Sequence, residues 1–373
     1  MSKRNFLYAA ITAFLIIATA WAQAYAMGHF DEQKQPENQA TQEKNKKNQI
    51  RALIYHHFGR ENKYPSTSVS EDQFKKHLAY LKKNDYTVLT LGRALDRLYG
   101  EDGLAEKNAV ITIDDGYRSV WENARPLLAK YGYPATLFIS TGNVGGSNYM
   151  SWKEIQKLEN EGFEIGNHSH SHDYFLNKPK DRIAGAFEAD LKKADEQFRK
   201  HLGRVPELYA YPFGEYIPEM MAVLKAHGYR AAAAQRSGVI HGRSRHYALP
   251  RFPMNYYYGD MEGFSNKMGM NGLPVMEAEP ESPLLEENNP PRLKLRIDTQ
   301  NINPAGLQCF VNGRKACQME KSQTNSALIL TVRAQDKLTD RRSLYTITAP
   351  STDGSKWFWY SHLWVIPQIS EGN

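Results

Sequence analysis

The sequence predicts an α/β domain built on a largely parallel sheet, followed by a small antiparallel β-sandwich. Between Arg51 and Val275, short apolar segments alternate with segments whose apolar residues recur at helical spacing. This alternation is typical of parallel strands joined by crossover helices, in a sheet that is either open or closed into a barrel. From residue 293 onward the apolar period becomes two, and turn residues separate short strands, as in a small sandwich.

The expected elements of the α/β domain follow from apolar spacing and helix-capping residues. The strand at 109–113 is apolar at nearly every position, as expected when both faces of a strand are buried. Ser70 is a plausible N-cap for the first helix. We expect strands at 52–55, 86–91, 109–113, 135–139 and 162–165, and helices at 70–84, 92–99, 121–131, 152–161 and 183–202.

The first residues predict export from the cell. Lys3 and Arg4 precede an apolar run from Phe6 to about Ala22, and Ala24-Tyr25-Ala26 is a small-x-small cleavage site. We therefore expect a signal peptide at 1–26 and a periplasmic or secreted protein, with an uncleaved membrane anchor as the alternative. No later apolar segment approaches the roughly 18 residues that a membrane span requires.

Composition divides the rest of the chain and excludes one class of partner. Residues 27–49 are polar and rich in Gln, Asn, Lys and Glu, so they predict a flexible leader. The α/β domain is expected at 50–276, an acidic, proline-rich linker at 277–292 and the sandwich at 293–373. The net charge of +6, which falls by two when Lys3 and Arg4 are removed, is too small to favour nucleic acid binding.

The only two cysteines, Cys309 and Cys317, flank an Asn312-Gly313 turn. Asn-Gly between strand-like segments is a strong hairpin signal. If the loop has an odd number of residues centred on Gly313, the cysteines face each other and an oxidising compartment permits a disulfide. Two reduced, buried thiols remain the alternative.

Adjacent carboxylates, Asp114 and Asp115, follow the buried strand at 109–113. Ligands bind at the carboxyl ends of strands in α/β domains. Two adjacent acids repel each other, so such a pair usually lies beside a cation or a positive side chain. Solvated acids in a turn are the alternative interpretation.

Three histidines, His168, His170 and His172, follow the expected strand at 162–165. His168 and His172 are four residues apart, so a single turn directs both imidazoles to one point. Histidines together with a carboxylate are a common ligand set for zinc and other divalent transition ions. The middle residue, His170, is expected to point away and not to bind the ion.

Here the sequence resembles a known family. Ile-Asp-Asp-Gly-Tyr at 113–117 and His-Ser-x-x-His at 168–172 resemble the first two signature motifs of the NodB-type polysaccharide deacetylases, carbohydrate esterase family 4, and the resemblance spans about Arg51 to Met276. It implies a distorted (β/α) barrel of fewer than eight strands. It also implies that Asp115, His168 and His172 bind a divalent metal, with Zn²⁺ expected and Ni²⁺, Co²⁺ or Fe²⁺ as alternatives, and that Asp114 is the general base.

The later motifs depart from the family pattern. Ala210 stands where the third motif carries an Arg that steadies the base, and Arg251 is the candidate substitute as a bidentate partner of Asp114. The backbone N–H of Phe213 is still expected to stabilise the oxyanion, because that role needs no side chain. The histidine that serves as general acid in the family is missing, since no histidine occurs between Met254 and Met276.

The chain resembles the branch of the family that acts on biofilm poly-N-acetylglucosamine, which has an early Tyr-His, here Tyr55-His56, and a variant third motif. His56 ends the first strand, which neighbours the last strand in a closed barrel, so it is our candidate for the general acid; lining the substrate groove is the alternative role for His56, and His57 is the substitute acid. Tyr-Pro-Phe-Gly-Glu at 211–215 resembles the third motif of that branch. Tyr211 and His57 are expected to contact the polysaccharide.

The expected reaction is metal-dependent hydrolysis of N-acetyl groups from a polysaccharide that contains N-acetylglucosamine, with release of acetate. Three alternatives remain. The same Asp and His ligands occur in iron oxygenases, the incomplete later motifs fit a glycan-binding protein without activity, and an O-acetyl esterase would use the same site. In the sandwich, aromatics at 357–360 and Trp364 are either core or a stacking platform for sugars, and core is favoured.

Overall fold

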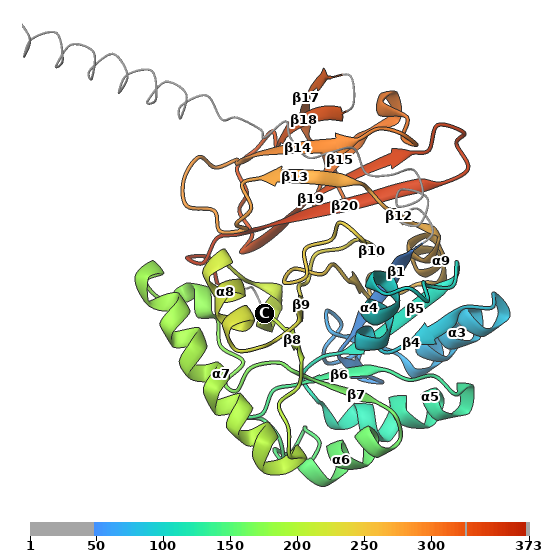
Figure 1. Ribbon diagram of the computed structural model, residues 1–373, viewed down its shortest axis with the longest axis vertical. Coiled ribbons are helices and arrows are strands. Elements are labelled where there is room, and N and C mark those ends of the chain that lie inside the picture. Colours follow the sequence, from blue (N-terminus) through green and yellow to red (C-terminus); the bar gives the residue numbers. More distant parts are fainter. Residues whose placement is uncertain (1–47, 325–326, 371–373) are drawn as a thin grey trace, which may run out of the picture. The chain divides into compact units, whose positions relative to one another are not determined.

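The computed structural model describes residues 48–324 and 327–370 (Figure 1). The predicted signal peptide and most of the predicted leader lie outside the described residues. None of the helices in the described part of the chain is long and apolar enough to cross a membrane.

A mostly parallel sheet closes on itself to form the α/β domain (Figure 1). Its strands pair in the order β1-β5-β6-β7-β8-β9, and β11 pairs with the other edge of β1. A bridge between Ala233 and Leu249 places the segment before β11 beside β9, which completes the ring. The implied barrel of fewer than eight strands is therefore confirmed, with seven strands around the ring. These strands are β1 (Gln49–Tyr55), β5 (Asn108–Ile113), β6 (Thr136–Ile139), β7 (Glu164–Asn167), β8 (Leu208–Ala210), β9 (Ala231–Ala233) and β11 (Phe252–Pro253).

Three further short pairings complete the strands of this domain. β4 (Thr87–Leu89) runs parallel to the first half of β5, and β10 (Ile240–His241) runs antiparallel to the start of β1. β2 (His57–Phe58) and β3 (Ser68–Val69) form a separate two-stranded sheet directly after β1. This small sheet fixes the chain that leaves the carboxyl end of β1.

A helix forms in each segment where the apolar spacing predicts one, and α8 and α9 form in segments for which no helix was predicted. Ser70 caps α3 by accepting a hydrogen bond from the N–H of Gln73 at 3.1 Å, as expected. The predicted helix at 121–131 begins as a π-helical turn, η1 (Val120–Ala124). The α-helices are α3 (Glu71–Lys83), α4 (Leu91–Tyr99), α5 (Arg125–Tyr131), α6 (Trp152–Asn160), α7 (Lys180–Leu202), α8 (Pro218–Ala226) and α9 (Met261–Gly269), and the short 3₁₀ turns are η2 (Phe175–Asn177), η3 (Pro212–Gly214) and η4 (Pro304–Gly306).

Alternate residues of the barrel strands enter two different cores. Leu53 and Ile111 pack with residues of the surrounding helices, whereas their neighbours Ala52 and Val110 pack in a second cluster with residues of α4. Every residue of β5 is buried. Both faces of this strand are thus covered, which is why its sequence is continuously apolar rather than alternating.

The C-terminal strands form two mainly antiparallel sheets, in which β12 pairs parallel with β20 (Figure 1). Residues alternating along β14 (Leu293, Leu295 and Ile297) share a core with Ile347 and Trp364 from the other sheet, so the predicted sandwich is confirmed and Trp364 is a core residue. One sheet has the order β12-β20-β19-β15-β16, and the other has the order β13-β14-β18-β17. The strands are β12 (Asn271–Gly272), β13 (Val275–Glu279), β14 (Arg292–Asp298), β15 (Gln308–Val311), β16 (Lys315–Ala316), β17 (Gln318–Gln323), β18 (Ala327–Arg333), β19 (Arg342–Pro350) and β20 (Trp357–Val365).

The hairpin of β15 and β16 has the register that the sequence suggested. Phe310 pairs with Ala316 and Val311 with residue 315, so the turn is centred on Gly313. Cys309 and Cys317 consequently face each other, and they form a disulfide with a Cα–Cα distance of 5.3 Å.

The start of the sandwich lies earlier than the sequence analysis placed it. β13 occupies part of the predicted linker at 277–292 and pairs with β14. The middle of that segment is also attached to the sandwich, because the N–H of Leu285 donates to the carbonyl of Val365 at 2.9 Å. Charged and proline residues favoured a linker, but in an edge strand such residues face solvent without disturbing the ladder.

Candidate active site

The residues singled out in the sequence meet at the carboxyl end of the barrel strands. His56 follows β1, the two aspartates follow β5, and the histidines follow β7. The loop 211–215 follows β8. Arg251 directly precedes β11, and this part of the chain lies between β9 and β1 in the barrel. Parallel strands end at the same edge of a sheet, so residues from five places in the sequence converge there.

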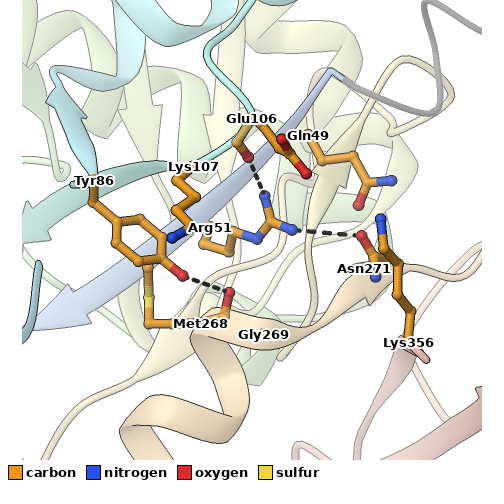
Figure 2. A pocket seen from close by; sticks show the side chains of 9 residues that line it. All are labelled: Gln49, Arg51, Tyr86, Glu106, Lys107, Met268, Gly269, Asn271 and Lys356. Carbon is orange, nitrogen blue, oxygen red and sulfur yellow. Dashed lines mark hydrogen bonds between the residues drawn. The ribbon is translucent and has the colours of Figure 1, made fainter. Parts of the chain in front are cut away.

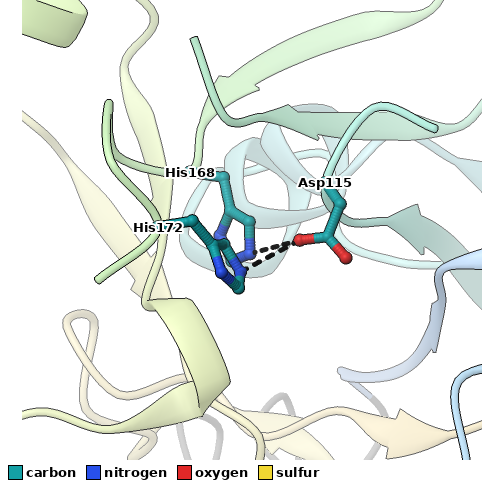
Figure 3. Close-up of side chains that lie close together, drawn as sticks. All are labelled: Asp115, His168 and His172. Atoms are coloured by element: carbon teal, nitrogen blue, oxygen red, sulfur yellow. Dashed lines mark ion pairs between the residues drawn. The ribbon is translucent and has the colours of Figure 1, made fainter. Parts of the chain in front are cut away.

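Asp115, His168 and His172 form a compact cluster (Figure 3). The Oδ1 atom of Asp115 lies 3.2 Å from Nε2 of His168 and 3.0 Å from Nε2 of His172. All the ligand atoms of the group lie within 4.8 Å of one another. Asp115 and His168 are buried, whereas His172 is partly exposed and leaves one side of the cluster open.

The cluster fits a divalent metal ion. Nδ1 of His168 lies 2.8 Å from the carbonyl oxygen of Ala210, so it carries the proton and Nε2 presents its lone pair to the cluster. His168 Nε2 and Asp115 Oδ1 are both buried without a hydrogen-bond partner. Burial opposes ionisation of Asp115, whereas imidazoles that donate a proton to its carboxylate would hold the pKa of this carboxyl well below its usual range. Two imidazole nitrogens and a carboxylate are a common donor set for zinc and related ions.

Backbone strain is concentrated at this cluster. Asp115, Ser169, His172 and Phe213 have φ values of 74°, 71°, 54° and 58°. Such conformations cost about 1–3 kcal/mol each for residues other than glycine, and they persist where surrounding contacts impose them. Here Ser169 Oγ accepts the N–H of His172 at 2.9 Å, which fixes the second histidine of the cluster. The strain therefore marks a site that the fold holds in one geometry.

The middle histidine, His170, lies outside the cluster, in line with the expectation that it is not a ligand. Its Nδ1 lies 3.0 Å from Oγ1 of Thr141. Asp190 of α7 accepts the N–H groups of His170 and Ser171 at 2.7 and 2.9 Å. These bonds anchor the loop between the two ligand histidines.

Asp114 forms a fully buried, bidentate pair with Arg251. The two nitrogen–oxygen distances are 2.7 and 2.8 Å, and neither side chain is exposed to solvent. Arg251 also donates to Oγ1 of Thr112 at 3.0 Å and to the carbonyl of Ala234 at 3.3 Å. Burial alone would raise the pKa of Asp114, but the guanidinium outweighs it and the pKa is lowered. The pair suggested by the missing third-motif arginine is therefore present.

The two adjacent histidines after β1 have different surroundings. Burial lowers the pKa of His56, and the carboxylates of Asp115 and Asp114 act against that effect, so His56 lies within the field of both aspartates. The ring of His57 is instead stacked between Tyr64 and Tyr117, at centroid distances of 4.8 and 3.5 Å.

His57 is 7% exposed, and burial lowers its pKa to about 4. Tyrosine rings cover the two faces of His57, which argues against the predicted contact with substrate. The same covering argues against His57 as the substitute acid.

The loop after β8 also differs from the prediction at one residue. Tyr211 is fully buried, and its hydroxyl donates to the carbonyl of Tyr247 at 3.1 Å. Tyr211 belongs to the core beneath the loop, which argues against the predicted contact with substrate. Phe213 is the partly exposed residue of the loop, and its ring contacts His172 edge-on at 4.6 Å.

Sequence reasoning missed Tyr174 and Tyr117. Tyr174 stacks on Phe213 at 3.6 Å, and Tyr117 covers His57. Both tyrosines lie two residues after a predicted ligand, Asp115 or His172. That proximity was the available signal, but tyrosines are frequent in this chain and proximity in sequence does not show direction.

A separate cavity of about 180 Å³ lies near the amino ends of β1 and β5 (Figure 2). Arg51 lines it and donates to the carbonyl of Met270 at 3.2 Å. Gln49 and Asn271 lie on the opposite side of the guanidinium from Tyr86. The catalytic residues follow the carboxyl ends of the same strands, so this cavity is not part of the candidate site.

Comparison with known proteins agrees with this geometry. A family model described as polysaccharide deacetylase matches residues 101–232, which include the Asp-Asp pair, the histidines and the loop after β8. A relative from Staphylococcus aureus (strain MRSA252), named poly-beta-1,6-N-acetyl-D-glucosamine N-deacetylase, is 31% identical over 217 residues. The match covers 55% of this chain and 74% of the relative.

Solved structures match the barrel. IcaB from Ammonifex degensii is 25% identical with a TM-score of 0.52, and the match covers 58% of this chain and 96% of that one. The Streptococcus pyogenes deacetylase PplD, solved in complex with acetate, has a TM-score of 0.54 at 20% identity, over 59% of this chain and 98% of its own. The second likeness is one of fold.

Proposed function

This chain belongs to the polysaccharide deacetylase family, and on that premise we propose that it removes N-acetyl groups from poly-β-1,6-N-acetylglucosamine with the aid of a divalent metal ion. The observation that carries this proposal is the Asp115–His168–His172 cluster beside the buried Asp114–Arg251 pair. The name of the Staphylococcus aureus relative supports the choice of polymer.

The metal would be held by Asp115, His168 and His172, with Zn²⁺ as the expected ion and Ni²⁺, Co²⁺ or Fe²⁺ as alternatives. When bound, it would lower the pKa of a water molecule and polarise the acetyl carbonyl. The lone pair of His168 Nε2 is already directed to this position by the bond from Nδ1 to Ala210.

Asp114 is the proposed general base. Its carboxylate is ionised at neutral pH because Arg251 lowers its pKa, so it can accept the proton of the attacking water. A carboxyl group with a lowered pKa has a weakly basic carboxylate, so the effectiveness of Asp114 as a base depends on its position. The bidentate pair with Arg251 fixes that position.

The remaining steps use groups on two other loops. The N–H of Phe213 is proposed to donate a hydrogen bond to the oxyanion that forms on the acetyl carbon. His56, as the imidazolium, is proposed to give its proton to the departing amine when the carbon–nitrogen bond breaks. Burial lowers the pKa of His56, and the negative charges of Asp115 and Asp114 offset only part of that effect. The products are acetate and a glucosamine unit.

The proposed compartment is the periplasm or the extracellular space. The predicted signal peptide supports export, and the Cys309–Cys317 disulfide is of a kind that persists in an oxidising compartment. A polysaccharide outside the cytoplasm is the substrate that such a location makes accessible.

Acetate release is the deciding measurement. The metal-loaded protein is incubated with poly-β-1,6-N-acetylglucosamine, chito-oligosaccharides and an O-acetylated glycan, with Asp114→Asn as the inactive control. We expect acetate from the first substrate, loss of activity with a chelator and recovery with Zn²⁺. Release from the O-acetylated glycan alone would identify an esterase. Binding of glycan without release from any substrate would overturn the enzymatic proposal.

A further inference from the structure

We propose that the C-terminal sandwich is part of the catalytic apparatus, because Arg341 and Arg342 position the Phe213 loop and, through it, the ligand His172. Arg342 is the first residue of β19 and Arg341 directly precedes it, more than a hundred residues after the loop. The family match at 101–232 includes the loop but neither arginine. The inference deepens the proposed function by giving the additional domain a role in the same site.

Arg342 holds the backbone of the loop directly. Its Nη1 atom donates to the carbonyl oxygen of Phe213 at 2.7 Å, and its guanidinium lies 5.6 Å from the centre of the Phe213 ring. Phe213 has a φ of 58°, a conformation that a bulky residue adopts only when contacts impose it. The peptide unit that follows Phe213 is therefore fixed by a side chain from the sandwich.

Arg341 holds the other end of the loop. It forms a bidentate pair with Glu215 at 2.7 and 2.8 Å, and both side chains are 3% exposed. Its remaining nitrogen, Nη1, donates to the carbonyls of Pro367 and Ile369 at 2.8 and 3.2 Å. The guanidinium of Arg341 is thus fixed by backbone carbonyls near the C-terminus while it binds the carboxylate of Glu215.

A continuous stack joins Arg341 to the metal cluster. The guanidinium lies 4.2 Å from the ring centre of Tyr174, and Tyr174 stacks on Phe213 at 3.6 Å with an interplanar angle of 7°. Phe213 in turn contacts the ring of His172 at 4.6 Å. His172 is the partly exposed ligand, so it has the least support from the barrel and depends most on this stack.

The contacts of Arg341 and Arg342 indicate that they position other groups and take no direct part in the reaction. Arg342 contacts the Phe213 carbonyl and Arg341 contacts the Glu215 carboxylate, so both act on the loop. The loop in turn contacts His172 through the Phe213 ring. Loss of either arginine should leave the polymer-binding surface in place and displace the oxyanion donor and one ligand. We therefore expect kcat to fall while KM stays nearly constant.

The central test compares Arg342→Met with Arg333→Met in the full-length protein. Arg333 is a matched control, since it is also half-buried in the sandwich and donates to a backbone carbonyl, that of Pro290, at 2.8 Å. We expect Arg342→Met to lower kcat about ten- to a hundredfold with KM within about twofold, as for a small misplacement of catalytic groups. Arg342→Lys should recover part of this loss, and Arg333→Met should behave as wild type.

Arg341 is tested together with its partner. Removing Arg341 alone would leave a buried, unpaired carboxylate and could unfold the protein, so the double variant Arg341→Met/Glu215→Leu replaces the charged pair by apolar side chains. Zn²⁺ affinity is measured by calorimetry on the unmodified and substituted proteins. It reports whether His172 is still in position to bind the ion, and the measurement does not require catalysis. We expect both the double variant and Arg342→Met to bind Zn²⁺ more weakly than Arg333→Met.

Two outcomes would overturn the inference. In one, Arg342→Met and the double variant keep both the wild-type kcat and the wild-type Zn²⁺ affinity. In the other, Arg333→Met loses as much kcat as Arg342→Met at the same melting temperature, which would indicate a general effect of the sandwich. If the wild-type protein releases no acetate, the proposed function fails, but the Zn²⁺ comparison still decides the positioning role.

Discussion

At the scale of single residues, the site depends on a carboxylate held in an unfavourable backbone conformation. Asp115 has a φ of 74°, and its carboxylate lies beside the imidazoles of His168 and His172. Asp and Asn tolerate this conformation better than other non-glycine residues. Asp115→Asn therefore changes the charge of the ligand with little effect on the backbone.

We expect Asp115→Asn to weaken Zn²⁺ binding more than about a hundredfold, beyond the tenfold to hundredfold cost of losing an outer partner of a metal ligand. Calorimetric titration with Zn²⁺ measures the change. His170→Gln is the control, because His170 lies in the same loop but bonds Thr141. Equal affinities of the two variants would contradict the assignment of Asp115 as a ligand.

Arg251 controls the charge of the proposed base. Burial of Asp114 favours its neutral form, and Arg251 reverses that preference, so replacing Arg251 should raise the pKa of Asp114. A base must be deprotonated to act. The acid limb of kcat/KM should therefore move to higher pH in Arg251→Met, by at least about one unit.

The pH profile of acetate release provides the measurement, and Arg251→Lys is the control. Lysine keeps a positive charge but cannot form the bidentate pair, so we expect a smaller shift. An acid limb at the wild-type position in Arg251→Met would show that another group sets the protonation state of the base. Melting curves of the variants are recorded together with the pH profiles, because removal of one partner of a buried pair lowers the free energy of unfolding by about 3–5 kcal/mol.

At the scale of elements, the loop after β8 is the part of the site that depends most on close packing. Gly214 has a φ of 72°, and a Cβ atom added there would lie 2.4 Å from both the backbone nitrogen and the Cβ of Gln235. The loop can approach the next strand only because residue 214 lacks a side chain.

We expect Gly214→Ala to displace this loop, to destabilise the fold by more than about 1 kcal/mol and to lower kcat about tenfold or more. Gly185→Ala on α7 is the matched control, since nothing lies within 4 Å of an added Cβ there and alanine favours a helix by up to about 1 kcal/mol. Melting temperature and acetate release measure both effects. A Gly214→Ala protein with wild-type kcat would contradict the importance of the loop position.

Elements were predictable from the sequence to the extent that their signals are local. The apolar segment at 109–113, the cap at Ser70 and the Asn312-Gly313 turn each specify their own structure within a few residues. β13 was missed because an edge strand may carry charges on its exposed face, so its composition resembled a linker. Its strand character comes from pairing with β14, which no local signal reveals.

In the candidate site too, residues with local signals were predictable and residues placed by long-range contacts were not. Asp114, Asp115, His168 and His172 were found because each follows a recognisable strand end. The direction of a side chain in a loop was harder to infer: Tyr211 and His57 lie in the right segments, but one packs into the core and the other lies between tyrosine rings. Arg341 and Arg342 contact the loop across more than a hundred residues, and only the assembled fold brings them there.

At the scale of the whole molecule, several histidines are buried in the neutral form. His77 is fully buried between α3 and the barrel, where its Nδ1 lies 3.0 Å from the hydroxyl of Tyr55 and its Nε2 lies 2.6 Å from the carbonyl of Gly259. Burial lowers the pKa of His77 to about 4, that of His241 to about 4 and that of His362 to about 3. In the unfolded chain these imidazoles titrate near their ordinary value of about 6.5.

These shifts predict that acid weakens the fold. Between pH 6.5 and about 4 the unfolded chain binds protons at these histidines while the folded chain does not, so the free energy of unfolding must fall as the pH decreases through this range. A shift of this size in His77 corresponds to about 3 kcal/mol at the acid end of the window.

His77→Gln keeps an acceptor and a donor in the same cavity but cannot be protonated, so it should reduce the difference in unfolding free energy between pH 7.5 and pH 4.5. Denaturant titrations at the two pH values measure that difference, with the exposed His246→Gln as the control expected to leave it unchanged. If His77→Gln preserves the wild-type difference, the neutral burial of His77 does not contribute to acid unfolding, and the remaining buried histidines and the carboxylates must account for it.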